Sequence, residues 1–221
     1  MSSRETKVGV PIDEDGVRKL QMGDVVYLSG VVYTLRDMAY ERAVELLGRG
    51  EELPFNLEDG AIWHCGPIMR KSNDKWKTVA AGPTSSSRFT ELEAELVRRL
   101  HTRLAIGKGT MGEATADAFK DVGGAYLLAT GGCAALHAMR VTNVENVYWL
   151  DLGMPEAVWV FRVKDLGPLV VGIDSNGKRL SDNVTKTVNE NLKRIFQKYQ
   201  LDPNRNYVWW PKRVVGTPIS L

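Results

Sequence analysis

The sequence predicts an α/β fold with mixed sheet layers and flanking helices. Helical patterns and β-rich runs alternate up to about residue 130, and strands dominate from about residue 145 onward. The 221 residues, of which 43% are hydrophobic and 25% charged, have an ordinary globular composition and are enough to bury a sizeable core. We expect one domain at residues 1–180, and a C-terminal helix and tail at 181–221 that pack on this domain or on a partner subunit.

The first strand is predicted by the β-rich run VVYLSGVVY at residues 25–33. Thr34 and Asp37 have the spacing of a capping box, so we expect the next helix to begin there, with Arg36 in its first turn, and to end near Gly48. A cation at this position opposes the helix dipole. Two explanations remain open: Arg36 serves a ligand, or it pairs with Asp37 or a nearby glutamate.

The remaining elements follow from periodicity and turn residues. A charged hairpin is expected at 70–77, and the helix at 89–103 is expected to begin with a second capping box formed by Thr90 and Glu93. Further strands are predicted at 61–65, 76–81, 104–106, 125–130, 147–150, 157–164 and 169–173, and further helices at 113–120 and 184–199. The tail beyond Leu201 carries Trp209 and Trp210.

Charge and cysteine usage exclude several classes of protein. A formal net charge of +2 gives no reason to expect a nucleic-acid or membrane partner, and no apolar run approaches the roughly 20 residues of a membrane span. The polar N-terminus, residues 1–10, lacks the apolar segment of a signal peptide. Cys65 and Cys133 stand far apart, which suits a reducing cytoplasm and provides no metal site within this chain. His64, His101 and His137 show no ligand spacing, so we expect packed or surface histidines.

The stretch from Gly82 to Gly109 has the features of an anion site. It begins with the hydroxyl-rich turn GPTSSSR, which ends on Arg88, and closes with IGKG, in which glycines flank Lys108. A turn that leads into a helix start offers free backbone N–H groups and the positive end of a dipole. For a single loop of this kind an ordinary polar surface turn is the simpler explanation. Two cation-bearing glycine loops joined by one helix favour anion binding.

Nucleotide sites are excluded by spacing. Gly107-Lys108-Gly109-Thr110 lacks the earlier glycine of a Walker A loop, since Thr102 stands five positions before Gly107, and Gly109 replaces the hydroxyl residue after the lysine. No complete G-x-G-x-x-G follows a predicted strand. ATP and NAD are therefore not expected as ligands.

Several short motifs, in order and at suitable spacings, resemble one family. They are Gly23-Asp24, Thr34-x-Arg36-Asp37, Gly66-Pro67, Gly82-Pro83-Thr84, Arg88, Ile106-Gly107-Lys108-Gly109 and Gly131-Gly132-x-Ala134. Together, over roughly residues 13–180, they resemble the C-terminal, β-subunit part of the iron–sulfur hydro-lyases, class I fumarate hydratase and L(+)-tartrate dehydratase. The strings GPIMRK and LGMPE look particularly like the tartrate dehydratase β subunit. The resemblance implies a swivelling β/β/α domain.

The resemblance also implies roles for individual residues. Arg36 and Arg88 match carboxylate-binding arginines, and Lys108 matches a lysine of the same site. Thr84 matches a threonine implicated as a base or proton relay, although hydrogen bonding at a helix start explains a threonine there equally well. Tyr40 stands where the family usually has a histidine to which a catalytic role is often assigned, so proton transfer at Tyr40 is left open.

The function expected from the resemblance is half of an active site. A larger α subunit would carry a [4Fe–4S] cluster on three cysteines, and the two would form an α2β2 assembly in the cytoplasm. Three cations suit a dicarboxylate whose hydration passes through an aci-carboxylate. Fumarate to malate is favoured because it belongs to central metabolism, and tartrate to oxaloacetate is the alternative. The competing class is a non-catalytic anion-binding module, a hypothesis that only Tyr40 supports.

Overall fold

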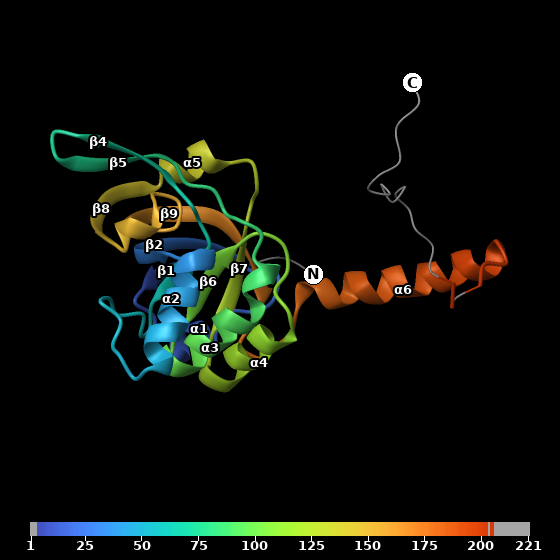
Figure 1. Cartoon of the computed structure of the whole chain (residues 1–221). Helices are drawn as coiled ribbons and strands as arrows, with labels where there is room; N and C mark the ends of the chain where they lie inside the picture. The colour runs from blue at the N-terminus through green and yellow to red at the C-terminus, as the bar shows by residue number, and fades with distance from the viewer. Residues whose placement is uncertain (1–3, 203, 206–221) are drawn as a thin grey trace, which may run out of the picture. The chain divides into compact units, whose positions relative to one another are not determined.

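The computed structural model describes residues 4–202, 204 and 205. The main sheet of this part of the chain contains seven strands in the order β1-β2-β3-β6-β7-β9-β8, and a separate hairpin contains two more (Figure 1). The sheet strands are β1 (Glu5–Val10), β2 (Val25–Thr34), β3 (Ala61–Trp63), β6 (Leu104–Gly107), β7 (Ala125–Ala129), β8 (Val141–Tyr148) and β9 (Val158–Ile173), and the hairpin strands are β4 (Ile68–Ser72) and β5 (Lys75–Ala80). The helices are α1 (Glu14–Val17), α2 (Asp37–Gly48), α3 (Thr90–Leu100), α4 (Glu113–Val122), α5 (Ala134–Ala138) and α6 (Leu180–Lys198), with short 3₁₀ turns at Ser87–Phe89 and Leu150–Leu152.

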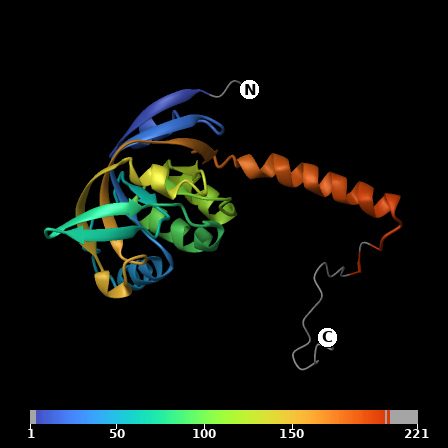
Figure 2. The ribbon, with the colours of Figure 1, turned by 90° about the horizontal axis from the view of Figure 1, so that it is seen from above.

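Five of the strands close on themselves. β2, β3, β6 and β7 run parallel in that order, and β9 pairs antiparallel with both β7 and β2. The result is a small barrel of β2, β3, β6, β7 and β9. β1 pairs with β2 and β8 pairs with β9 outside this ring. Figure 2 shows the curvature of β9, drawn in orange, that this closure requires. Register shifts along the β2–β9 ladder, at Leu28 and Gly30, bend the strands in the way that β-bulges do.

Side chains of the barrel strands alternate between two apolar cores. Trp63 and Ile106 belong to the inner core, and their neighbours Ile62 and Ala105 belong to a second core beneath the helices. This is the period of two that a strand imposes. The second core also receives apolar side chains from α2, α3 and α4, of which α3 lies beside both α2 and α4 (Figure 1). The mixed sheet with flanking helices confirms the predicted α/β class, whereas the swivelling β/β/α assignment stays a prediction.

Most predicted elements are present, and the main differences are as follows. β1 and the short helix α1 have no counterpart among the predicted elements; in β1 only Val8 is buried, and Glu5, Lys7 and Gly9 are exposed. The strands predicted at 157–164 and 169–173 are one strand, β9, since the residues between them stay paired with β2 through Leu166. β8 begins at Val141, six residues before the predicted start at Val147.

Both predicted capping boxes are wrong. Arg36, in extended conformation, is the N-cap of α2 and lies before its first turn, and its side chain makes no capping bond. α3 begins at Thr90 itself, and no side chain caps its N-cap residue, Phe89. Thr34 instead joins two strands, because its hydroxyl donates to the Ala157 carbonyl (3.2 Å) and accepts from the Trp159 N–H (2.9 Å).

Thr34→Val is expected to lower the free energy of unfolding by about 1–3 kcal/mol, because the isosteric side chain leaves a buried N–H and carbonyl of β9 unpaired. Urea unfolding measures the change. Thr102→Val is the matched control: Thr102 is also fully buried, but its hydroxyl has no partner among the described residues. The control should be neutral or stabilising. Equal losses in the two variants would contradict the role given to Thr34.

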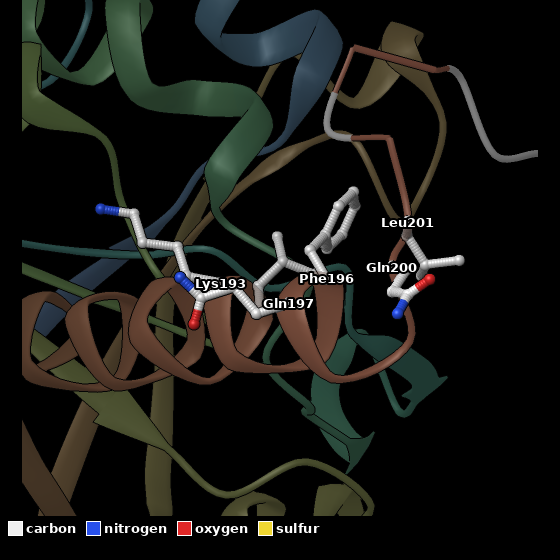
Figure 3. A pocket seen from close by; sticks show the side chains of 6 residues that line it. Lys193, Phe196, Gln197, Gln200 and Leu201 are labelled. Atoms are coloured by element: carbon white, nitrogen blue, oxygen red, sulfur yellow. The ribbon is translucent and has the colours of Figure 1, made fainter.

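The chain divides into two compact units between Asp182 and Asn183. Most of α6 lies in the second unit, where its apolar residues are exposed. A hollow on this unit is lined by Leu192, Lys193, Phe196, Gln197, Gln200 and Leu201, whose side chains Figure 3 shows along the end of the helix. No helix among the described residues is long and apolar enough to cross a membrane. The packing of 181–221 on the domain or on a partner stays a prediction, and Trp209 and Trp210 lie outside the described residues.

Candidate active site

The predicted site residues follow the ends of parallel strands. Because β2, β3, β6 and β7 are parallel, their carboxyl ends lie along one edge of the barrel. Arg36 follows β2, Gly66 follows β3, Lys108 follows β6 and Gly131 follows β7. The turn that carries Thr84 and Arg88 joins this edge through an isolated bridge between Ser85 and Lys108. Residues more than 70 positions apart are thus gathered in one place by the sheet.

Arg88 is held by several acceptors at once. Its Nε and Nη2 donate to the two carboxylate oxygens of Asp37, at 2.6 and 2.9 Å, in a bidentate pair. Nη2 also donates to the Thr84 hydroxyl (3.1 Å) and Nη1 to the Ser85 carbonyl (2.5 Å). The guanidinium lies 4.4 Å from the centre of the Phe89 ring. Arg88 therefore has a defined orientation and connects the hydroxyl turn to α2.

Arg36 also lies near the Asp37 carboxylate. Its Nη2 lies 3.6 Å from Asp37 Oδ2, and its Nε lies 3.3 Å from Glu156 Oε1 without hydrogen-bond geometry. The guanidinium packs directly over Gly66, where a Cβ atom would lie only 2.6 Å from Nη1, so this position has no room for a side chain. A buried donor of Arg36 is thus left without a hydrogen bond among the described residues.

Glu156 lies at the site but was not predicted as one of its residues. Its Oε2 accepts the Met38 N–H (2.9 Å), which satisfies one of the free donors in the first turn of α2. The negative charge also favours the positive end of that helix. Glu156 therefore caps α2 from a distant loop and balances the charge of Arg36, which is why the helix tolerates an arginine at its N-cap.

Lys108 is fixed through its backbone and not through its charge. Its N–H donates to the Thr84 carbonyl (3.2 Å) and to Ser86 Oγ (3.1 Å), and its carbonyl accepts from the Ser86 N–H (3.0 Å). The side chain extends past Gly131, where a Cβ atom would lie 2.9 Å from Lys108 Cδ. Among the described residues, the ammonium group makes no hydrogen bond or ion pair. The Lys108 cation is therefore left available on the side of Gly131.

Comparison with known proteins matches this arrangement to a family. The family model described as Fumarase C-terminus matches residues 2–184. The chain belongs to the Fumarase C-terminus family. It is 47% identical over 181 residues to the putative L(+)-tartrate dehydratase subunit beta of Methanocaldococcus jannaschii, with 81% of this chain and 93% of that protein covered. It is 41% identical over 170 residues to the L(+)-tartrate dehydratase subunit beta of Escherichia coli K12, with 77% and 83% covered.

A longer relative shows the same relationship. The chain is 39% identical over 186 residues to the putative fumarate hydratase class I of Geobacillus stearothermophilus, which covers 84% of this chain but only 35% of that protein. In the relatives named subunit beta the matched segment is most of the protein, whereas in the Geobacillus protein it is about a third of the chain. The resemblance found in the sequence is therefore confirmed.

Of the predicted site residues, Arg36, Arg88, Thr84 and Lys108 come together at the strand ends, and Tyr40 does not join them. Tyr40 is fully buried in the helix-side core, with its hydroxyl against His64 Nε2 (2.8 Å) and Glu93 Oε2. Burial, together with the Glu93 carboxylate, raises the pKa of Tyr40 well above its ordinary value. Tyr40 therefore stays a protonated hydrogen-bond donor behind the site, and its catalytic assignment stays a prediction.

The cysteines of this Fumarase C-terminus chain do not form a cluster site. Cys65 is buried, and burial raises the pKa of its thiol far above the ordinary value, so the thiolate that binds iron is disfavoured. The residues that the structure describes contain no group of three or more His, Cys, Asp or Glu side chains suited to a metal ion. The residues within the described part of the chain therefore do not fit a [4Fe–4S] cluster.

Asp37→Asn is expected to destabilise the protein by less than about 1 kcal/mol at pH 7, with the difference from wild type disappearing in acid. The hydrogen bond from Arg88 lowers the pKa of Asp37 below its ordinary value of 3.8. A lowered folded-state pKa stabilises the fold above the unfolded-state value, and this stability is lost as the pH falls through the folded-state pKa. Urea unfolding of both proteins from pH 7 to pH 2 measures the difference, and a difference that stays constant with pH would contradict the ion pair.

Proposed function

We propose that this chain is the β subunit of an iron–sulfur hydro-lyase that reversibly adds water to a four-carbon dicarboxylate, with fumarate to malate as the reaction. The observation that carries the proposal is the position of Asp37. Its carboxylate lies 2.6 Å from Arg88 Nε and 3.6 Å from Arg36 Nη2, and Arg88 also donates to the Thr84 hydroxyl. The strand-end edge therefore accommodates a carboxylate among cations.

The residues of this chain have separate tasks in the proposed reaction. Arg36 and Arg88 attract a substrate carboxylate through their positive charges and bind it with the N–H groups that Asp37, Thr84 and Ser85 leave free. The Lys108 ammonium stabilises the extra negative charge that develops on the carboxylate next to the reacting carbon. The Thr84 hydroxyl accepts from Arg88, so its own proton points elsewhere and negative charge on its oxygen is stabilised during proton transfer.

The second candidate is L(+)-tartrate, which would lose water to give oxaloacetate. The names of the relatives that are 47% and 41% identical favour it. Both substrates place two carboxylates in the same site and differ by one hydroxyl group, so the same cations serve either reaction.

The [4Fe–4S] cluster is assigned to a partner α subunit, in keeping with the name subunit beta of the relatives and with the cysteines of this chain. We expect an α2β2 assembly in the cytoplasm in which the strand-end edge faces the partner. This chain then contributes the cations and a hydroxyl to an active site completed by the other subunit.

The test is anaerobic co-expression of the full chain with the cysteine-bearing partner that co-purifies from the native source, followed by iron reconstitution. Fumarate, malate and both tartrate enantiomers are assayed. We expect turnover by the complex and none by this chain alone. Turnover of fumarate by the isolated chain would contradict the proposal that this chain supplies only part of the active site. A complex that contains the cluster but is inactive on all four acids would favour the non-catalytic anion-binding module.

Lys108→Ala in the same complex is expected to lower turnover about a hundredfold while assembly is retained, because one charge-stabilising group is removed. Size-exclusion chromatography checks assembly and initial rates check turnover. Loss of the complex in this variant would return Lys108 to a structural role.

A further inference from the structure

Four polar side chains form a buried row behind the cationic edge. They come from different elements: Glu93 from α3, Tyr40 from α2, His64 from the end of β3, and Ser86 from the turn before the 3₁₀ segment. All four have no exposed surface. Burying a polar group costs free energy unless the group is hydrogen-bonded. Four such side chains in one core are therefore expected to form a hydrogen-bonded network, and such networks fix the geometry of the residues around them.

The contacts in the row are short and continuous. Ser86 Oγ lies 2.8 Å from His64 Nδ1, and His64 Nε2 lies 2.8 Å from the Tyr40 hydroxyl, which donates to Glu93 Oε2. The Ser86 hydroxyl has two other neighbours, the Thr84 carbonyl at the longer distance of 3.3 Å and the Tyr126 hydroxyl. The geometry therefore assigns one direction: Ser86 donates to Nδ1, Nε2–H donates toward Tyr40, and Tyr40 donates to Glu93. This direction places a proton of His64 on Nε2.

The row ends at the backbone of the two site loops. Ser86 Oγ accepts the Lys108 N–H (3.1 Å), and the Thr84 N–H donates to the His64 carbonyl (2.8 Å). The side chain and the backbone of His64 thus fix the hydroxyl turn, and Ser86 fixes the lysine loop to it. The Phe89 ring lies 5.0 Å from the Tyr40 ring and 4.9 Å from the His64 ring, and its other contact is the Arg88 guanidinium.

A carboxylate is tolerated at the far end of the row for a local reason. Glu93 is in the first turn of α3, where the positive end of the helix dipole favours negative charge. Its second oxygen, Oε1, has no partner among the described residues, so the group is held at one oxygen only, by Tyr40 and His64. Glu93, which was predicted to form a capping box with Thr90, thus contacts Tyr40 and His64 and does not cap α3.

We propose that Glu93, Tyr40, His64 and Ser86 are positioning residues that hold the Thr84 and Lys108 loops in the geometry required for the hydro-lyase reaction. The proposal rests on the function proposed above. None of the four reaches the surface, so they act through Thr84, Lys108 and Arg88 and not on the substrate. Tyr40 supplies the link in the row that joins α2 to the loops.

The first test measures kinetics in the reconstituted complex. Ser86→Ala and Tyr40→Phe each break one link and should lower kcat about 10- to 100-fold, with KM within about threefold of wild type. Glu93→Ala should lower kcat similarly, and Glu93→Gln, which keeps an acceptor for Tyr40, should recover most of it. Tyr33→Phe and Thr115→Val are the matched controls and should leave kcat unchanged, because these hydroxyl-bearing residues lie in other contacts. Wild-type kcat in both Ser86→Ala and Tyr40→Phe would overturn the proposal.

The second test does not depend on activity or on the partner. The full chain contains three histidines, so its ¹⁵N-histidine NMR spectrum resolves the His64 imidazole. We expect the Nε2–H tautomer, with Nδ1 shifts that move in Ser86→Ala and Nε2 shifts that move in Tyr40→Phe. Hydrogen exchange at the Lys108 amide should accelerate at least tenfold in Ser86→Ala. An Nδ1–H tautomer, or unchanged exchange at Lys108, would overturn the positioning row, whereas an inactive wild-type complex would count against the proposed function alone.

Discussion

Arg88→Ala is expected to lower kcat/KM of the assembled enzyme by roughly two to three orders of magnitude, while the complex still forms. The substitution removes one of two guanidinium groups around the carboxylate position and also the hydrogen bond to the Thr84 hydroxyl. Binding and proton transfer are therefore weakened together. Initial rates over a range of substrate concentration, with cluster content measured in the same samples, give the effect.

Two further variants test whether the effect of Arg88→Ala is specific to the Arg88 guanidinium group. Arg88→Lys keeps the charge but cannot form the bidentate pair with Asp37, so it should recover little activity. Arg42→Ala removes a comparable bidentate pair, with Asp151, on the surface of the same helix. It should leave kcat/KM within about twofold of wild type, since exposed ion pairs contribute little. Similar losses in Arg42→Ala and Arg88→Ala would show that the helix, and not the site, is sensitive.

Gly107→Ala is expected to lower the free energy of unfolding by about 3 kcal/mol and to disturb the site. A Cβ atom at this position would overlap Ser86 Oγ and lie 2.7 Å from His64 Nδ1 and 2.9 Å from the Tyr126 hydroxyl. These neighbours are fully packed, so relief requires movement of the strand end that precedes Lys108. Urea unfolding measures the loss.

Gly48→Ala is the matched control for this substitution. A Cβ atom there meets nothing within 4 Å, and the residue ends α2, so alanine should be neutral or slightly stabilising. If Gly107→Ala is as stable as wild type, the close packing of β6 against the buried polar row is wrong.

The fold class and the cationic residues were predictable from the sequence because they depend on local patterns. β-rich runs, glycine turns and a helix start are visible in a single segment. Arg36, Thr84, Arg88 and Lys108 were singled out from such turns and helix starts and from the family resemblance, and their roles stay predictions. A buried strand that bends but stays paired, such as β9, looks like two strands because Gly167 and Pro168 interrupt the local pattern.

The remaining features depend on contacts that no single segment contains. Thr34 and Thr90 have the spacing of a helix cap, yet the Thr34 hydroxyl is taken by β9 and Glu93 by Tyr40 and His64. Glu156 caps a helix 118 positions away in sequence. His64 was expected only as a packed or surface histidine, and it is packed, but its partners come from three other elements. Tertiary competition for the same side chains explains each of these differences.

Closure of the five-stranded barrel fixes the distance between the strand ends that precede Arg36 and Lys108. β2 carries Arg36 and is bonded to β3 on one flank and β9 on the other, while β6 carries Lys108 between β3 and β7. No strand of this ring can slide without breaking ladders on both sides. In the proposed enzyme, acids of different length would therefore be accommodated by side-chain conformation or by the partner subunit. The strands that precede Arg36 and Lys108 would not move.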